Sequence, residues 1–340
     1  MLHLKLCAVA RALSAVAALA AAAAFPSASP ARELVLAEPV HYVGFLPVYV
    51  ALKQGYFTDE GIELRILTME GPAMIPAVVA GRAFALTASV DRNAQAKAGG
   101  REVKAVVDLN ARANIYLMAR KDLMPVSGDL ATFLKGKRIA VTLYGGTPNT
   151  MLRYLLAQWK LDPKSDVTLI EVNSQAVVAV TVGAGQADVG VSAEPFISQG
   201  IHKGIWGGPI YAAKDLGPYA DTAISVNGDS IRQEPQLVRS LVKGVMRGLL
   251  HTDAHRAEML EFAKAEFPTT SQDDLKASLD RAFADQIFST DGFIRPEAWT
   301  LGEAVVRQAG SVKQPVGYDE VIDMSFVKAL QPELKINPSR

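Results

Sequence analysis

The sequence predicts an α/β fold of two lobes, with a ligand cleft between the lobes and two crossover strands joining them. Three observations lead to this prediction. Short apolar strands alternate with helices in two separate series, one before residue 108 and one between residues 137 and 199. One strand leads out of the first series and another returns to it, and the chain beyond is mostly helical. Such alternation is typical of sheets with parallel strands.

The segment 44–66 is the clearest part of the first series. Pro47 suits the first position of a helix, because it has no amide hydrogen to lose there, and the helix is predicted to run to residue 53. Gly55 is suited to the left-handed conformation that ends helices, and residues 62–66 alternate as a strand. With a strand at 33–37 in front, this order predicts a right-handed parallel βαβ unit.

The other elements follow from apolar periodicity and from glycine, proline and capping residues. The first series continues with a helix from 71 to 81, a strand at 84–88, a helix at 90–98 capped by Ser89 and a strand at 103–107. The second series comprises strands at 137–143, 167–172 and 187–191 and helices at 148–159, 175–182 and 195–199. The crossover strands are predicted at 114–120 and 222–226, and a strongly amphipathic helix at 236–250.

Residues 1–31 have the order of an export signal. Lys5 and Arg11 precede a run of apolar residues, and small residues lead to a cleavage site at Ala31. The apolar run is shorter than the roughly 20 residues that span a bilayer. The only cysteine, Cys7, lies inside this signal, so we expect a mature chain without thiol or disulfide, located in the periplasm.

The domain organisation follows from these elements. We expect a signal peptide (1–31), the first part of lobe 1 (32–119), lobe 2 (120–221), and a return strand with a helical C-terminal part that completes the lobes (222–340). The chain has 35 basic and 35 acidic side chains, so its formal net charge is zero. This balance gives no long-range attraction to nucleic acid or to an anionic membrane surface.

Candidate binding residues follow the strands, at the sheet edge where open α/β folds bind ligands. One glycine-rich corner comprises Tyr144, Gly145, Gly146 and Thr147, with Thr147 expected as the N-cap and Pro148 as the first helical residue. Free amides of that first turn could face an anion. A capped helix that binds nothing explains the same residues.

Two further corners carry charge. Ser89 offers a hydroxyl, and Asp91 or Arg92 offers a charge; alternatively these residues only cap the helix and face solvent. Glu194 precedes Pro195 at a strand-to-helix corner, and we favour a role in the cleft for it. A buried carboxylate there requires a cationic or hydrogen-bonding partner.

Aromatic side chains near these corners suit a flat or small organic ligand, although each also fits a place in the core. These candidates, with one histidine, are His41, Tyr42, Phe45, Tyr49 and Tyr144. Asn114, on the outgoing strand, either contacts the ligand or only holds the segments of the hinge together.

Catalysis has little support in the sequence. His251 and His255 have the spacing of a metal-binding pair, but Thr252 and Asp253 are expected to form an N-cap that breaks the helix between them. No nucleophile elbow or kinase signature is present. We therefore expect no catalytic residue, no metal and no cofactor.

The chain resembles a known family in several segments. The run LPVYVALKQGYFTDEGIELRI, then AVVAGRAFALTASVD, GKRIAVTLYGGTPNTMLRYLLAQWKL and VGAGQADVGVSAEPF, are similar to periplasmic substrate-binding proteins of ABC transporters. The group concerned binds nitrate, sulfonates, taurine or thiamine-pyrimidine precursors. The resemblance implies a type II-like periplasmic binding protein fold. It places the family's ligand corners on His41 to Tyr49, Ser89 to Arg92, Tyr144 to Thr147, and Glu194.

The resemblance also implies a function. The chain would be a monomer that captures a small solute and delivers it to an ABC permease with a cytoplasmic ATPase. The glycine-rich corner and Arg92 favour an organic anion, a sulfonate or a carboxylate, which is our first hypothesis. The aromatic residues with Asp91 and Glu194 favour instead a heterocycle such as a thiamine pyrimidine precursor.

Two other classes of protein remain as alternatives. Relatives that synthesise a thiamine pyrimidine rely on cysteine-rich and histidine residues, and the absence of cysteine from the mature chain counts against that enzyme. An extracytoplasmic sensor subunit that presents its ligand to a receptor is the other alternative.

Overall fold

The structure, a computed structural model, describes residues 31–69, 71–126 and 128–336. All of the predicted signal peptide except Ala31 therefore lies outside the described residues. Residues 33–340 group into one compact unit by their contacts. Within the described ranges, no helix combines the length and the apolar character that a membrane crossing requires.

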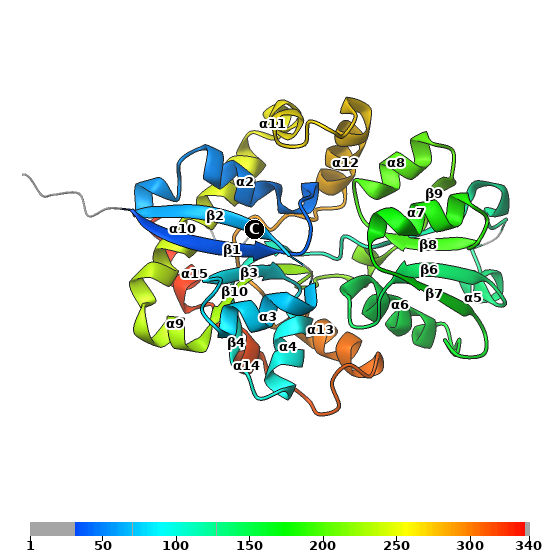
Figure 1. Ribbon diagram of the computed structural model, residues 1–340, viewed down its shortest axis with the longest axis horizontal. Coiled ribbons are helices and arrows are strands. Elements are labelled where there is room, and N and C mark those ends of the chain that lie inside the picture. The colour runs from blue at the N-terminus through cyan, green and yellow to red at the C-terminus, as the bar shows by residue number, and fades with distance from the viewer. Residues whose placement is uncertain (1–30, 70, 127, 337–340) are drawn as a thin grey trace, which may run out of the picture. The chain divides into compact units, whose positions relative to one another are not determined.

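Lobe 1 is built on a five-stranded sheet with the strand order β2-β1-β3-β10-β4 (Figure 1). The strands are β1 (Arg32–Glu38), β2 (Ile62–Thr68), β3 (Ala85–Ala88), β4 (Val103–Asn110) and β10 (Thr222–Asn227). β1 pairs with β3 in parallel, whereas the returning strand β10 lies antiparallel between β3 and β4. The predicted return strand is therefore confirmed, and it is part of the lobe 1 sheet.

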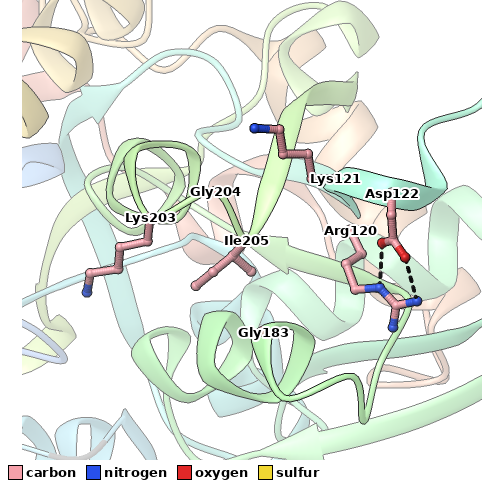
Figure 2. A pocket seen from close by; sticks show the side chains of 7 residues that line it. All are labelled: Arg120, Lys121, Asp122, Gly183, Lys203, Gly204 and Ile205. Carbon is pink, nitrogen blue, oxygen red and sulfur yellow. Dashed lines mark hydrogen bonds and ion pairs between the residues drawn. The ribbon is translucent and has the colours of Figure 1, made fainter.

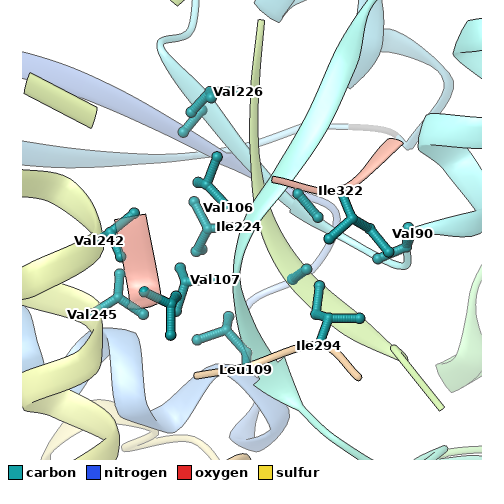
Figure 3. Close-up of a cluster of buried hydrophobic side chains, with 14 of the residues drawn as sticks. Val90, Val106, Val107, Leu109, Ile224, Val226, Val242, Val245, Ile294 and Ile322 are labelled. Carbon is teal, nitrogen blue, oxygen red and sulfur yellow. The ribbon is translucent and has the colours of Figure 1, made fainter. Parts of the chain in front are cut away.

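Helices from both ends of the chain surround this sheet. The early ones are α2 (Leu46–Lys53), α3 (Gly71–Val79) and α4 (Asp91–Ala98). The late ones are α9 (Gly228–Gln233), α10 (Pro235–Ala254), α11 (Met259–Glu266), α12 (Gln272–Ala284), α13 (Pro296–Gln308), α14 (Tyr318–Val321) and α15 (Ser325–Leu330). Valine and isoleucine side chains of β4 and β10 pack with Val242 and Val245 of α10 (Figure 3). This contact buries the apolar face of the predicted amphipathic helix.

Lobe 2 has a second five-stranded sheet, with the order β7-β6-β8-β5-β9. Its strands are β5 (Tyr116–Arg120), β6 (Arg138–Thr142), β7 (Thr168–Val172), β8 (Val189–Ser192) and β9 (Trp206–Ala212). Its helices are α5 (Leu130–Leu134), α6 (Thr147–Gln158), α7 (Gln175–Gly183) and α8 (Phe196–His202). Strands β7, β6 and β8 are parallel, and β5 lies antiparallel between β8 and β9.

Two connections join the sheets and run beside each other. Residues 111–115 lead from β4 to β5, and residues 213–221 lead from β9 back to β10. Backbone hydrogen bonds tie them together, since the amide of Tyr219 donates to the carbonyl oxygen of Ala111 at 3.0 Å and the amide of Ala213 to that of Ile115 at 2.9 Å. The hinge therefore has two paired strands of backbone rather than one.

Short 3-10 turns complete the description. They are η1 (Val43–Phe45), η2 (Thr58–Glu60), η3 (Lys121–Leu123), η4 (Ala213–Leu216) and η5 (Arg256–Glu258). Gly55 has φ +74°, as expected for the left-handed residue after a helix.

Several local predictions are wrong. β9 was not expected, because its Gly-Gly-Pro sequence interrupts the apolar alternation. α10 continues through His251 to Ala254, since the hydroxyl of Thr252 donates back to the carbonyl oxygen of Gly248 at 2.8 Å instead of capping a new helix. Val90, not Ser89, is the N-cap of α4.

Candidate functional site

A cluster of buried polar side chains lies where the lobe 1 sheet meets the two connections. We call Asp91, Asn114, Tyr219 and Asp221 the acidic cluster. Asp91 begins α4 directly after β3, Asn114 lies on the outgoing connection, and the other two lie on the returning one. Hydrogen bonds hold these segments together, because the hydroxyl of Ser89 donates to the carbonyl oxygen of Ala220 at 3.4 Å.

Each member of the acidic cluster is almost completely shielded from solvent. The exposed fractions are 1% for Asp91, 3% for Asn114, 1% for Tyr219 and 7% for Asp221. Yet both carboxylate oxygens of Asp91, Oδ1 of Asn114 and the hydroxyl of Tyr219 find no hydrogen-bond partner among the residues that the structure describes. Buried polar groups without partners are costly, and strain, a functional role or a bound water or ion is the usual explanation for them.

Burial also changes the acidity of this cluster. Loss of solvent raises the pKa of Asp91, although the nearby hydroxyl of Ser89 and the charge of Arg92 oppose this shift. Burial raises the pKa of Asp221 to about 7, with the charge of Asp91 adding to it and the backbone amide of Asn114 working against it. Two carboxyl groups that interact inside a protein cannot both ionise freely.

Tyr42 and Thr222 border the acidic cluster. The hydroxyl of Tyr42 lies beside the side chains of Thr222 and Asn114, and burial together with the charge of Asp221 raises the pKa of Tyr42. The ring of Tyr42 stands edge-on to Phe45, with centroids 4.5 Å apart. Among the sequence candidates, therefore, Tyr42, Ser89, Asp91 and Asn114 come together.

His41 and Tyr49 belong to a different cluster, around the buried carboxylate of Glu38. The hydroxyl of Tyr49 donates to Glu38 at 2.6 Å, and the hydroxyl of Thr68 donates to it at 3.0 Å. Nδ1 of His41 lies 3.0 Å from Glu38, and its Nε2 lies 3.3 Å from Glu266. Tyr49 is therefore fully engaged within lobe 1.

Phe45 and the guanidinium group of Arg92 do not belong to the acidic cluster. Phe45 is 2% exposed and packs in a core with Tyr49 and residues of α11 and α12. The guanidinium group of Arg92 lies against Gly71, where an added Cβ would be only 2.8 Å from its Nη2.

The glycine-rich corner of lobe 2 differs in detail from its prediction. Gly146 is the N-cap of α6, so Thr147 is the first helical residue and the predicted Thr147 cap is wrong. Gly146 has an extended backbone, and its carbonyl oxygen accepts from the amide of Thr150 at 3.0 Å. Since Gly146 has no side chain, it provides no side-chain cap for the first amides of α6. Gly145 has φ +83°, a backbone conformation that favours glycine.

Some polar side chains around the glycine-rich corner have hydrogen-bond partners within the protein, and others do not. The hydroxyl of Tyr144 donates to the carbonyl oxygen of Ala309, just after α13, at 3.1 Å, and Arg153 lies over the Tyr144 ring. The amide group of Asn149 donates to Thr142 and to Glu171. The hydroxyls of Thr142 and Thr150 have no partner in the described part of the chain.

Glu194 has protein partners on every side. It accepts from the amide and hydroxyl of Ser198 at 3.2 and 3.0 Å and from the hydroxyl of Ser278 at 3.0 Å. Nε of Arg281 completes the set at 2.6 Å. Ser278 and Arg281 belong to α12, so this buried carboxylate joins lobe 2 to a helix that packs on lobe 1. The partner that sequence analysis required for Glu194 is Arg281.

Two surface pockets lie away from these residues. The first, of about 510 Å³, is lined by Arg120, Lys121, Asp122, Lys203 and neighbours, with Arg120 paired to Asp122 (Figure 2). Arg120 ends β5, which is antiparallel to β8, so this pocket lies at the opposite sheet edge from the glycine-rich corner. The second, of about 530 Å³, surrounds the end of α13. Neither contains a candidate from the sequence.

His251, in the last turn of α10, and His255, its C-cap, contact each other and nearby groups. The rings of His251 and His255 are stacked with centroids 4.2 Å apart, and Nδ1 of His251 lies 2.8 Å from the hydroxyl of Tyr56. In the described ranges no group of three or more metal-ligating side chains converges.

Sequence reasoning missed Tyr219, Asp221 and Thr222. Tyr219 and Asp221 precede the predicted return strand and Thr222 begins it, and an antiparallel strand enters the sheet at the edge where its neighbours end. This topology puts the three residues beside Ser89 and Asp91. In agreement, the amide of Val90 donates to the carbonyl oxygen of Ala220 at 3.4 Å.

Comparisons with known proteins identify the family. Residues 43–259 match the family described as NMT1/THI5 like, and the chain belongs to this family. The chain is 24% identical over 305 residues to the binding protein YtlA of Bacillus subtilis, covering 88% of this chain and 90% of that one. It is 27% identical over 329 residues to the riboflavin-binding protein RibY of Chloroflexus aurantiacus, covering 90% and 91% of the two chains.

A solved structure with a similar fold is the alkanesulfonate-binding protein SsuA of Xanthomonas axonopodis pv. citri, bound to MOPS. The TM-score is 0.70 at 15% identity, and the match covers 87% of this chain and 99% of that one. The protein therefore has the two-lobed periplasmic binding protein fold that the sequence predicted.

Proposed function

We propose that this protein is the solute-binding component of an ABC importer. It would capture a small organic solute between its lobes, in the periplasm, and deliver it to a permease driven by a cytoplasmic ATPase. The observation that carries the proposal is the acidic cluster, a set of buried and partly unpartnered polar groups at the junction of two lobes. Interlobe positions of this kind are typical ligand sites.

The ligand class that fits this cluster best is an uncharged or weakly basic heterocycle. Asp91 and Asn114 present acceptor oxygens without a partner in the described part of the chain, and Asp221 adds a second buried carboxyl group. Acceptors attract N–H and O–H groups and repel anions. The similarity to a riboflavin-binding protein supports a heterocycle as well. This reverses the order of preference that the sequence alone gave.

An organic anion remains the second candidate, with lobe 2 as its support. The first amides of α6 carry no side-chain cap, and the hydroxyls of Thr142 and Thr150 lack partners within the described residues. Helix amides and hydroxyls are donors that suit a sulfonate or a carboxylate. The similar fold of an alkanesulfonate-binding protein agrees with this candidate.

We propose a binding role without catalysis, for a chain that is exported as a monomer after cleavage near Ala31. Steady turnover of a pyrimidine precursor by the purified protein would contradict this. Genes for a permease and an ATPase beside this gene would support import, whereas a kinase gene would support the sensor alternative.

A thermal-shift screen of the chain from Arg32 onward tests the proposal. The panel comprises riboflavin, aminopyrimidines, ethanesulfonate, taurine, nitrate and aromatic carboxylates. A solute at 100 times its dissociation constant adds about 2.7 kcal/mol of stability, which is a clear shift in melting temperature. A hit that is also taken up by cells only when this gene is intact supports the function. Normal uptake of that solute by the deletion strain contradicts it.

A further inference from the structure

The helix α12 contacts both lobes, and it uses a different face for each. Figure 1 shows α12 between α11 and the lobe 2 helix α8, and it packs against both. Its apolar face is buried in a core that is built mainly from lobe 1 residues and that also contains Ala193 of lobe 2. A second face is polar, and the spacing of three or four residues puts its members on one side of the helix. We call these members the polar stripe: Asp274, Ser278, Arg281 and Asp285.

The polar stripe contacts lobe 2 along its whole length. At its start, Oδ1 of Asp274 lies 2.5 Å from Nδ1 of His202, the last residue of α8. In its middle, the stripe supplies two donors to the buried carboxylate of Glu194. At its end, Asp285 accepts from the hydroxyl of Tyr116 in β5 at 2.7 Å. Lobe 2 is therefore held by polar contacts over about three helical turns, whereas lobe 1 is held by apolar packing.

Several groups in these contacts also have a bond within their own lobe. Glu194 accepts from the amide and the hydroxyl of Ser198, next to it in lobe 2. On α12, the hydroxyl of Ser278 also donates to the carbonyl oxygen of Asp274 at 2.7 Å, and the carboxylate of Asp274 accepts from Ser271 at 2.7 Å. Separation along the polar stripe therefore leaves these groups hydrated and partly bonded, without burying any of them unpaired. Separation of α12 from lobe 1 would instead expose its apolar face to water.

We propose that the polar stripe of α12 is a latch between the lobes. It holds them in the arrangement described above, and it releases lobe 2 while α12 stays on lobe 1. The two backbone connections at residues 111–115 and 213–221 are the hinge of this movement. A solute that contacts both lobes favours the latched arrangement and adds to the latch, a consequence that rests on the proposed solute-binding function. The latch itself acts before any solute binds.

Two substitutions weaken the latch at its ends without changing either core. Tyr116→Phe removes the hydroxyl that binds Asp285 but keeps the ring, and Asp285 retains a pair with Lys214 at 3.4 Å. His202→Ala removes the partner of Asp274, at a side chain that is 47% exposed. Loss of one hydrogen bond should increase the ratio of released to latched molecules about fivefold. The two ends are far enough apart for the effects to multiply, to about 25-fold in the double variant.

The experiment measures single-molecule energy transfer between dyes on the two lobes, in the absence of solute. The dyes are attached to Glu63→Cys in β2 and Lys164→Cys between α6 and β7, both at exposed positions. The protein is purified after expression of the full chain, with Cys7→Ser so that these are its only thiols. The control is Lys276→Gln, on the same helix, where the side chain is 60% exposed and pairs with Asp280.

We expect a second distance between the dyes, populated more in Tyr116→Phe and His202→Ala than in the wild type and most in the double variant. The control should match the wild type. Identical distributions in all of these proteins overturn the proposal, and so does a second population that is equally large in Lys276→Gln. Lower stability of the stripe variants in urea without a second population means that these contacts only fix α12 in place, which also refutes a latch. Because no solute is present, the importer function is decided separately, by uptake in the deletion strain.

Discussion

Over part of the acidic pH range, the carboxyl group of Asp221 is protonated in the folded chain and ionised in the unfolded chain. Burial raises its pKa from 3.8 to about 7. Between these two values the folded state is protonated and the unfolded state is not, so the free energy of unfolding falls as the pH rises from about 4 to about 7. Above about pH 7 this contribution is constant. The charged or titratable groups that face Asp221 are Asp91, Asp108, Tyr42 and Tyr219.

Asp221→Asn should therefore flatten the pH dependence of stability below pH 7. The measurement is urea unfolding of Asp221→Asn, the wild type and the control Asp229→Asn at several pH values from 4.5 to 8. Asp229 is a suitable control because its side chain is 63% exposed and pairs with Arg232. The two curves of wild type and Asp221→Asn should approach each other at low pH, where the carboxyl of Asp221 is protonated in the folded wild type. A variant whose stability changes with pH as steeply as that of the wild type would contradict the assignment.

The pKa of His41 is raised in the folded chain. Hydrogen bonds to Glu266 and Glu38 raise its pKa from 6.5 to about 9, against the opposing effect of burial. The stability that this proton contributes is complete below about pH 6.5 and is lost as the pH rises through 9. Because the side chain is 39% exposed, solvent screens the two ion pairs and the contribution is modest.

His41→Gln should thus lower stability at pH 6 and leave it nearly unchanged at pH 10. Thermal unfolding at both values measures this, with His255→Gln as the control, because the ring of His255 bonds to the backbone carbonyl oxygen of His251 and stacks on the His251 ring. Equal losses at both pH values would indicate that packing of His41 on Tyr49 and Phe267, not its proton, is what stabilises the fold.

At the scale of elements, α12 has an unusual position, because it packs in a lobe 1 core while its polar face binds lobe 2. Arg281 is the charged partner of Glu194, which is only 2% exposed. Tyr116 of β5 also donates to Asp285, directly after α12, at 2.7 Å. Removing one partner of a buried ion pair leaves the other charge uncompensated, at a cost of about 3–5 kcal/mol.

We therefore predict that Arg281→Gln lowers the free energy of unfolding by about 3 kcal/mol. Lys276→Gln on the same helix is the matched control, since Lys276 and Asp280 are 60% and 65% exposed and such surface pairs contribute about 0.5 kcal/mol. Glu194→Gln combined with Arg281→Gln should recover part of the loss. Urea unfolding of the four proteins provides the values, and equal effects of Arg281→Gln and Lys276→Gln would refute the buried pair.

The sequence was sufficient for most elements and insufficient for most contacts between them. Proline and glycine positions located α2 and α6 within a residue or two, because they act on the local backbone. The partner of Glu194 lies 87 positions away, and nothing local signals it. The acidic cluster and its neighbour Ser89 show both cases. Ser89 and Asp91 follow a predictable strand, whereas Tyr219 and Asp221 reach them only through the path of the returning chain.

At the scale of the whole molecule, two sheets share elements that connect their cores. α13 supplies Val305 to the apolar core of lobe 2 and Val306 to that of lobe 1. α12 adds the ion pair of Arg281 with Glu194, and the two connections pair with each other through their backbones. Unfolding either lobe alone would expose an apolar side of α13 and break these contacts. Residues 33–340 also form a single compact unit by their contacts.

The lobes should therefore unfold together, although proteins of this size often unfold in steps. Two of the three tryptophans report on different cores, Trp206 in lobe 2 and Trp299 in lobe 1. The test uses two variants, one that keeps Trp206 and lacks Trp299 and one that keeps Trp299 and lacks Trp206. In each variant, the urea midpoint measured by fluorescence should coincide with the midpoint measured by far-ultraviolet circular dichroism. A fluorescence midpoint that precedes circular dichroism in one variant and follows it in the other would mean that the lobes unfold independently. The shared helix α13 would then be too weakly packed to couple them, and closure around a ligand would have to rely on the hinge alone.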